Sequence, residues 1–260
     1  MAGLFDRQAE AYADSRPKYP SEWYSKIAAL TPNRTLAWDV GTGNGQAAIG
    51  VAEHYEQVIA TDVSKDQLKH ATPHPKVHYV HTPFSMSKEE LASLVGGEGS
   101  VDLITVAEAV HWFDHPTFYS LANHVLKKPG GVIVVWGYKN CTVDPAFDRV
   151  MERFRNSSAA YLHPNNHYLS DYYSSLPFPF ESIGVGSEGN PLMLELPVEY
   201  SFDGLLKWIS TWSVVPLAKA SGVDLLNEDM VKEFESAWGG SNLTRTVINK
   251  AFMIAGKPKI

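Results

Sequence analysis

The stretch Trp38-Asp39-Val40-Gly41-Thr42-Gly43-Asn44-Gly45 determines the fold that we expect for this chain. It connects residues 35–40, an apolar run typical of a buried strand, to residues 46–54, which have the pattern of a helix. A glycine-rich turn between a strand and a helix allows a ligand to approach the backbone closely beside the helix N-terminus. A simple tight loop would need the same glycines, so the turn alone leaves both interpretations open.

The rest of the first half alternates in the same way. Apolar segments over 57–62, 76–81, 101–107 and 131–136 are separated by helical patterns over 65–71, 89–95 and 118–126. This alternation predicts right-handed βαβ units and a doubly wound α/β fold with a mostly parallel, seven-stranded sheet. Two N-terminal helices are expected before residue 31. After residue 140 we expect helices within 144–176, extended segments over 178–186 and 192–202, two helices within 203–238 and a closing strand over 246–255.

Composition narrows the class of protein. The chain has 260 residues, of which 44% are hydrophobic and 20% charged, as in packed globular proteins. Its net charge of −7 disfavours a nucleic-acid partner, because such binding needs Lys and Arg to replace counterions. No apolar run approaches the ~18 residues that a membrane span requires, and the lone Cys141 fits a reducing compartment. We therefore expect a cytoplasmic protein with no membrane partner.

Asp62 ends the second expected strand, 21 residues after Gly41. At this distance a doubly wound fold places a carboxylate that accepts both hydroxyls of an adenosine ribose. The alternative role for Asp62 is to cap the helix that follows Ser64. The glycine turn at the expected distance favours the ribose.

The same turn bears on which nucleoside would bind. The NAD fingerprint needs a glycine at the sixth position of the turn, where this chain has Gln46. Asp39 precedes the first glycine, and a carboxylate there would repel a pyrophosphate but attract the ammonium of a methionine moiety. The turn therefore favours S-adenosylmethionine over NAD.

With these residues the sequence resembles the class I S-adenosylmethionine-dependent methyltransferases, and within them the type 11 group that includes trans-aconitate methyltransferases and plant embryo-abundant proteins. The resemblance covers about residues 1–140 and is carried by Phe5-Asp6, Tyr12, Arg16-Pro17-Lys18-Tyr19-Pro20 and residues 39–45, 60–64, 102–113 and 126–131. It implies one methyltransferase domain over 1–260, with N-terminal lid helices in 1–34, a cofactor-binding core in 35–140, and acceptor-recognition insertions and the last strands in 141–260. The cofactor would be S-adenosyl-L-methionine, and its expected contacts are Arg16, Tyr19, Asp39, Gly41, Thr42, Gly43, Asp62, Val63, Phe84, Ala107 and His111.

His111 is the candidate catalytic base, because it follows the fourth strand at the carboxyl edge of the sheet and its unperturbed pKa of ~6.5 suits proton acceptance. The alternatives are that it lines the cofactor pocket, which the position favours, or that it packs beside Trp112. Aromatic residues of the second half would bind the acceptor, although ordinary core packing explains each of them as well; with Trp112 they are Trp136, Tyr138, Trp208 and Trp212.

The nature of the acceptor stays open at this stage. Arg153, Arg155 and Arg245 could hold a carboxylate, or could form solvated surface. The resemblance to trans-aconitate methyltransferases favours O-methylation of a small carboxylate, whereas the aromatic content suits a phenol or an amine. His163 and His167 have a Pro between them and no third ligand, so no metal is expected. An NAD-dependent enzyme and a cofactor-binding protein without transferase activity are the remaining alternatives, and the oligomeric state is a monomer or a homodimer.

Overall fold

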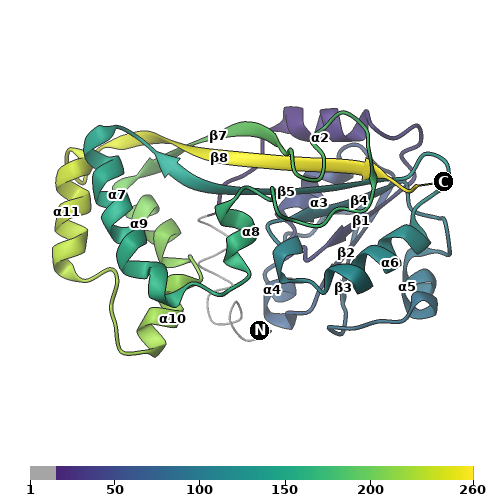
Figure 1. Ribbon diagram of the computed structural model, residues 1–260, viewed down its shortest axis with the longest axis horizontal. Coiled ribbons are helices and arrows are strands. Elements are labelled where there is room, and N and C mark those ends of the chain that lie inside the picture. The colour runs from purple at the N-terminus through teal and green to yellow at the C-terminus, as the bar shows by residue number, and fades with distance from the viewer. Residues whose placement is uncertain (1–15, 260) are drawn as a thin grey trace.

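The computed structural model describes residues 16–259, which form one central sheet with helices on both faces (Figure 1). The first helix expected from the sequence, before residue 13, lies outside the described residues. The elements of the parallel half are α2 (Ser21–Ala28), β1 (Leu36–Val40), α3 (Gln46–Ala52), β2 (Gln57–Asp62), α4 (Lys65–Lys69), β3 (Val77–His81), α5 (Lys88–Val95), β4 (Leu103–Ala107), the 3₁₀ turn η2 (Val110–Trp112), α6 (His115–Val125) and β5 (Val132–Thr142).

The second half begins with α7 (Pro145–Ser158), the 3₁₀ turn η3 (Ala159–Tyr161) and α8 (Asn166–Ser170). It continues with β6 (Glu181–Ser182), β7 (Leu192–Ser201), α9 (Phe202–Ser210), α10 (Val214–Ala220), α11 (Glu228–Trp238) and β8 (Thr244–Lys257). Two helices were expected within 203–238 and three are present. The helical pattern is interrupted after Ser210, where the Thr211 hydroxyl donates to the carbonyl of Trp208 at 2.6 Å.

The strand order is β3-β2-β1-β4-β5-β8-β6, and β7 also pairs with β8. Strands β1 to β5 are parallel, and β8 runs antiparallel to β5, so the predicted doubly wound α/β fold is confirmed. The sheet has eight strands rather than seven, because the short β6 and the longer β7 pair with successive parts of β8.

The apolar strand residues are divided between the two faces of the sheet. Ala37, Val58 and Leu103 pack on one face with residues of α2 and α3, and Trp38 and Ile104 pack on the other with residues of α5 and α6. Because strands covered on both faces have no solvent-facing side, near-continuous apolar runs form them. This explains why the sequence marks the parallel strands clearly.

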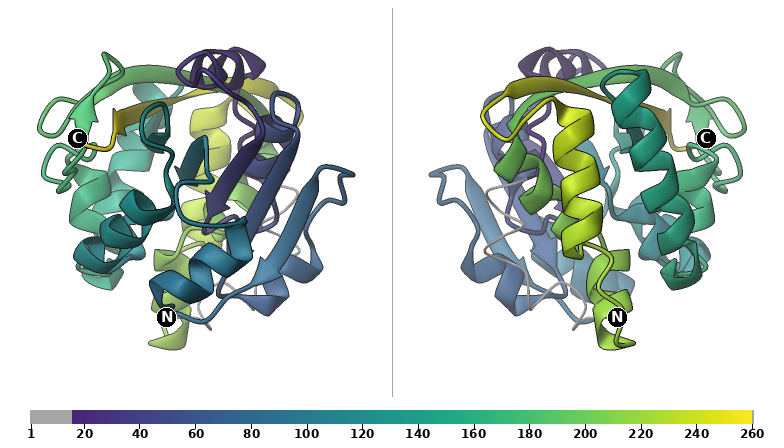
Figure 2. Two further views of the ribbon diagram at one scale, coloured as in Figure 1. Left: turned by 90° about the vertical axis from the view of Figure 1, so that its right-hand side faces the viewer. Right: turned by 90° about the vertical axis from the view of Figure 1, so that its left-hand side faces the viewer.

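Strands β5, β7 and β8 extend past the parallel strands towards a group of helices (Figure 1). α7 and α11 lie side by side there, which the right panel of Figure 2 also shows, and α9 packs against β7. The apolar run 131–136 suggested a short β5, whereas the strand continues to Thr142 because β8 pairs with it along this whole length. This extension carries Tyr138 and Lys139 away from the parallel core towards the helices.

Strand order reverses between β1 and β4, since the chain moves outward from β1 through β2 to β3 and then returns to β4. Ligands of open α/β sheets bind at the carboxyl ends of strands beside such a reversal. The glycine turn after β1 and residues 108–114 after β4 are therefore the segments that build the site.

Candidate functional site

The glycine turn forms the floor of the site. Gly41 has a φ of +68°, and a Cβ at this position would lie 2.6 Å from the Cβ of Ala109. A side chain at residue 41 would therefore meet both backbone strain and a steric clash. The backbone N–H groups of Gly41 and Thr42 donate to the carbonyl of Thr61, which fixes the turn against the end of β2.

The carboxylate of Asp62 spans two backbone donors. Its Oδ2 accepts the N–H of Gly43 at 2.7 Å, and its Oδ1 accepts the N–H of Ser64 at 2.8 Å. The N-cap of α4 is Ser64, whose hydroxyl accepts the N–H of Gln67 at 3.1 Å. The capping role considered for Asp62 is therefore filled by another residue.

Asp39 lies beneath the turn and is 1% exposed. Its Oδ1 accepts the hydroxyl of Thr105 at 2.6 Å, and its Oδ2 accepts the hydroxyl of Thr42 at 2.5 Å. Burial raises the pKa of Asp39 to about 6, although both hydroxyls act in the opposite direction. Burial thus destabilises the ionised form of Asp39, while two hydroxyls orient its oxygens. Such a carboxylate suits a cationic group nearby.

A cavity of about 270 Å³ lies over this floor. Nine of the residues predicted to contact the cofactor line it: Tyr19, Asp39, Gly41, Thr42, Gly43, Asp62, Val63, Phe84 and Ala107. The cavity also reaches the segment after β3, where Thr82, Pro83 and Ser85 accompany Phe84, whose side chain is 76% exposed. Arg16 and His111 were predicted to belong to the same group, but the structure places them at a second cavity.

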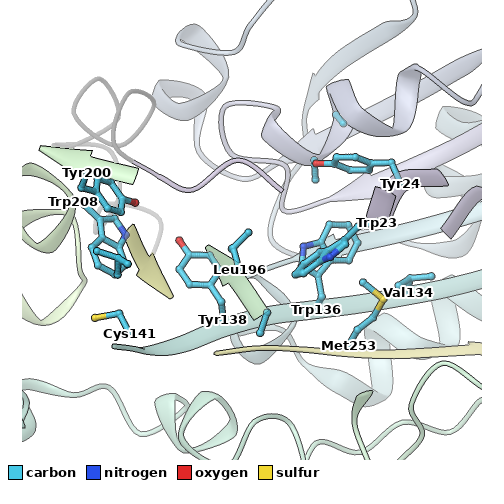
Figure 3. Close-up of a cluster of buried hydrophobic side chains, with 14 of the residues drawn as sticks. Trp23, Tyr24, Val134, Trp136, Tyr138, Cys141, Leu196, Tyr200, Trp208 and Met253 are labelled. Carbon is cyan, nitrogen blue, oxygen red and sulfur yellow. The ribbon is translucent and has the colours of Figure 1, made fainter. Parts of the chain in front are cut away.

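This second cavity, of about 210 Å³, lies between the extended part of β5 and the helices of the second half. Three cationic residues line it: Arg16, Lys139 and Arg155. Trp208 and Trp212, two of the residues predicted to bind the acceptor, also line this cavity. The buried indole N–H of Trp208 has no hydrogen-bond partner among residues 16–259, and in Figure 3 it lies on the ring edge that is turned towards Tyr138.

Neutral groups accept hydrogen bonds from both arginines of the second cavity. Arg16 donates to the hydroxyl of Tyr138 at 3.1 Å and to the carbonyl of Thr211 at 3.0 Å. Arg155 donates to Oδ1 of Asn140 at 2.9 Å. Because the carboxamide of Asn140 carries no charge, it orients the guanidinium of Arg155 without neutralising it.

Three residues line both cavities: Glu108, Trp112 and Tyr138. Figure 3 shows Tyr138 lying between the pair formed by Trp208 and Tyr200 on one side and Trp136 on the other. Trp112 and Tyr138 were predicted as acceptor residues, but Glu108 was not singled out. Its position directly after an apolar strand at the ligand edge of the sheet was the signal that could have found it.

His111 is 2% exposed, and its Nδ1 lies 3.0 Å from the hydroxyl of Tyr173. Burial lowers its pKa to about 3, and the neighbouring His115, Lys139 and His163 act in the same direction. The imidazole is therefore neutral around pH 7. A group with so low a pKa is a weak proton acceptor, so the structure does not support His111 as a general base.

Trp136 and two of the three candidate arginines lie away from both cavities. Trp136 is 1% exposed and lines neither cavity, because Tyr19 packs edge-on against it with ring centroids 5.5 Å apart. Of the three arginines considered for a carboxylate, only Arg155 lines the second cavity. Arg153 pairs with Glu233, and Arg245 pairs with Asp144 at 2.5 Å.

Two negative findings apply to the described residues. No group of three or more His, Cys, Asp or Glu side chains within 16–259 is placed to hold a metal ion. None of the helices there has the length and apolar character that crossing a membrane requires.

Comparison with known proteins identifies the family. Residues 38–135 match the family model described as a methyltransferase domain. A protein of Dictyostelium discoideum assigned as a methyltransferase is 30% identical over 248 residues, which cover 92% of this chain and 89% of that protein. The solved structure of an Anaeromyxobacter dehalogenans protein assigned as a type II methyltransferase matches with a TM-score of 0.78 and 30% identity, over 93% of this chain and 97% of that one. Methyltransferase cfoB of Aspergillus candidus is 35% identical over 49% of this chain and 41% of its own length.

The chain belongs to the S-adenosylmethionine-dependent methyltransferases of the type 11 group. It is an enzyme of that family, and the resemblance stated from the sequence is thereby confirmed.

Proposed function

We propose that this enzyme transfers the methyl group of S-adenosylmethionine, bound in the first cavity, to a small organic anion bound in the second. The observation that carries this proposal is the charge of the second cavity: three cations line it, and Glu108 is the one carboxylate among its lining residues within 16–259. The two cavities meet at Glu108, Trp112 and Tyr138, so a group that leaves one can enter the other there.

The residues of the first cavity fit the cofactor. Gly41 and Gly43 line this cavity without side chains, so a ligand can lie close to the backbone of the turn. The carboxylate of Asp62, fixed by two backbone N–H groups, is oriented to accept the ribose hydroxyls. Asp39 would attract the ammonium of the methionine moiety, and Phe84 offers its ring to the adenine.

The cofactor supplies an already activated methyl group on a sulfonium. The protein therefore has mainly to align the acceptor with the methyl carbon and to exclude water. Trp112 and Tyr138 present aromatic groups at the junction, which suit a cationic centre. Residues 141–260 contribute Arg155, Trp208 and Trp212 to the acceptor cavity, which fits the acceptor-recognition role predicted for this part of the chain.

An anion could accept the methyl group in two ways. A carboxylate oxygen could be methylated directly, as the resemblance to trans-aconitate methyltransferases suggests. Alternatively, the carboxylate could be held by the cations while a phenol or amine elsewhere on the molecule reacts. The cationic lining supports both versions equally, because either acceptor carries the same acid group.

A transfer assay tests the proposal. Methyl-labelled S-adenosylmethionine would be incubated with the enzyme and a panel of aliphatic and aromatic carboxylates, each paired with its uncharged primary amide. We expect transfer to members of the acid series and little transfer to the amides. Equal use of acids and amides would contradict the proposed role of the cations.

Two arginines of α7 provide a matched pair of variants. Arg155→Met should raise the acceptor KM by about 10- to 100-fold, since a charge-assisted hydrogen bond contributes roughly 1.5–3 kcal/mol. Arg153→Met removes the same charge from an exposed position on the same helix and should leave KM unchanged. An unchanged KM in Arg155→Met would show that the anion does not bind at this end of the cavity.

A further inference from the structure

Glu108 is held firmly at the boundary between the two cavities. Its backbone has a φ of +56°, which is strained for a residue with a side chain. Its N–H donates to the carbonyl of Trp136 at 2.9 Å, and its Oε1 accepts the N–H of Tyr138 at 2.5 Å. A Cβ at residue 137 would lie 2.8 Å from Oε1, so the glycine there makes room for the carboxylate.

The second oxygen of this carboxylate is available to a ligand. Within 16–259 no protein group forms a hydrogen bond to Oε2 of Glu108, and the residue lines both cavities. The charged groups that act on Glu108 are Arg16 and Lys139, and the neutral His111 lies in the wall of the same cavity. The phenol of Tyr173, whose pKa burial raises well above 10, also lies near enough to interact with Glu108.

We infer that Glu108 is a catalytic residue that accepts a proton from the acceptor as the methyl group is transferred. This inference rests on the proposed function and makes it more specific. The acceptor is then an organic anion with two different groups: an acid held by the cations of the second cavity, and a separate hydroxyl or amine that reacts beside Glu108.

The step balances as follows for a hydroxyl acceptor. The acceptor oxygen forms a bond to the methyl carbon with one of its electron pairs. At the same time the bond between the methyl carbon and sulfur breaks, and the electron pair of that bond stays on sulfur. The proton of the hydroxyl passes to Oε2 of Glu108, which becomes a neutral carboxylic acid. The products are the methyl ether and S-adenosylhomocysteine, and the proton returns later to solvent.

The electrostatic environment suits this role. Burial raises the pKa of Glu108 to about 7, against the opposing effects of the Tyr138 N–H, Arg16 and Lys139. A base with a pKa near the working pH combines a useful ionised fraction with enough basicity to accept a proton. A carboxylate acceptor has no proton to give, so direct carboxylate methylation would leave this group without a function.

The first experiment needs no acceptor. Binding of S-adenosylmethionine and of S-adenosylhomocysteine would be measured at pH 7 by calorimetry in two buffers of different ionisation enthalpy, which yields the protons released. The two ligands share the ammonium, carboxylate and ribose and differ in the positive charge on sulfur. Because that charge at the junction would favour ionised Glu108, S-adenosylmethionine should release more protons, by up to about half a proton per site.

Two variants decide the assignment. Glu108→Gln should abolish the difference between the two ligands in the number of protons released. Glu195→Gln, which changes an exposed residue of β7, should retain this difference. Retention of the full difference in Glu108→Gln would overturn the inference, because Glu108 would then not face the reacting sulfur.

The second experiment measures turnover with 4-hydroxybenzoate and benzoate as probes. We expect methylation of the hydroxyl of the first probe and no methylation of benzoate. Glu108→Gln should lower kcat by about 10²- to 10⁴-fold and remove the inflection of the pH profile near 7, with the affinity for S-adenosylhomocysteine changed less than threefold.

Equal turnover of wild type and Glu108→Gln, or methylation of benzoate at its carboxylate, would overturn the inference. If the wild type methylates neither probe nor any other anion, the proposed function fails instead, and the proton-release measurement still decides whether Glu108 faces the sulfur.

Discussion

The carboxylate of Asp62 accepts the backbone N–H of Gly43 at 2.7 Å and so joins the end of β2 to the glycine turn after β1. These residues are far apart on the chain but meet because β1 and β2 are neighbouring parallel strands, with Val40 paired to Thr61. The contact places the acid at the rim of the first cavity with both of its oxygens oriented by backbone donors. One interaction therefore shapes the turn and presents the carboxylate.

Asp62→Ala should weaken binding of S-adenosylhomocysteine by about 10- to 100-fold, because a hydrogen bond to a charged group contributes roughly 1.5–3 kcal/mol. Calorimetric titration measures the effect. Asp66→Asn is the control, since Asp66 lies on α4 and pairs with Lys69 away from the cavity. Equal affinity of wild type and Asp62→Ala would assign Asp62 a purely structural role.

Asp39 predicts a dependence of stability on pH. Its folded pKa of about 6 lies above its ordinary value of 3.8, so the folded state binds the proton more tightly than the unfolded state. The stability contributed by this proton is complete below about pH 4 and is lost as the pH rises through 6. Asp39→Asn should therefore raise the melting temperature more at pH 8 than at pH 4, by a few degrees.

Thermal unfolding of both proteins at the two pH values measures this difference. The same variant should bind S-adenosylmethionine less tightly, because an amide does not attract the ammonium as a carboxylate does. A variant with wild-type affinity would argue against placing the methionine end over Asp39.

Most of the residues that line the first cavity were predictable from the sequence. The glycine turn and Asp62 follow consecutive strands marked by buried apolar runs, and a doubly wound fold always brings two such strand ends together. Nine predicted cofactor residues line one cavity for this reason. Arg16, which was predicted with them, lines the second cavity instead, because it reaches over to Tyr138 and Thr211 from the second half of the chain.

The second cavity depends on packing that the sequence does not display. Arg153 and Arg155 are two residues apart on one helix, and therefore about 200° apart around its axis. Which of them faces the cavity is decided by how α7 packs, above all against α11, which is distant in the sequence. Glu108 belongs to the segment after the fourth strand that the sequence placed at the ligands, but it was given no role of its own, because its backbone conformation is rare for glutamate.

His111 provides a contrasting prediction. Since burial keeps its imidazole neutral near pH 7, His111→Gln should leave the inflection of the pH–kcat profile unchanged. The variant loses the contact with the hydroxyl of Tyr173, so its melting temperature should fall by several degrees. A pH profile that loses its inflection in His111→Gln would return the role of base to this histidine.

Replacing Trp208 by Phe should affect binding of the acceptor. Its buried indole N–H has no hydrogen-bond partner among the described residues, so Trp208→Phe loses no protein hydrogen bond there. Loss of a neutral donor to the acceptor should raise the acceptor KM by about 2- to 10-fold, while the cofactor affinity stays the same. An unchanged KM would show that the N–H does not contact the acceptor.

The position of the sulfur in bound S-adenosylhomocysteine is the most direct test of the proposed arrangement, and a crystal structure of that complex measures it. We expect the ribose hydroxyls within hydrogen-bond distance of the Asp62 carboxylate, and the sulfur directed towards Glu108, Trp112 and Tyr138, where the two cavities meet. A sulfur directed away from these residues, with the second cavity separated from it by protein, would contradict methyl transfer between the cavities.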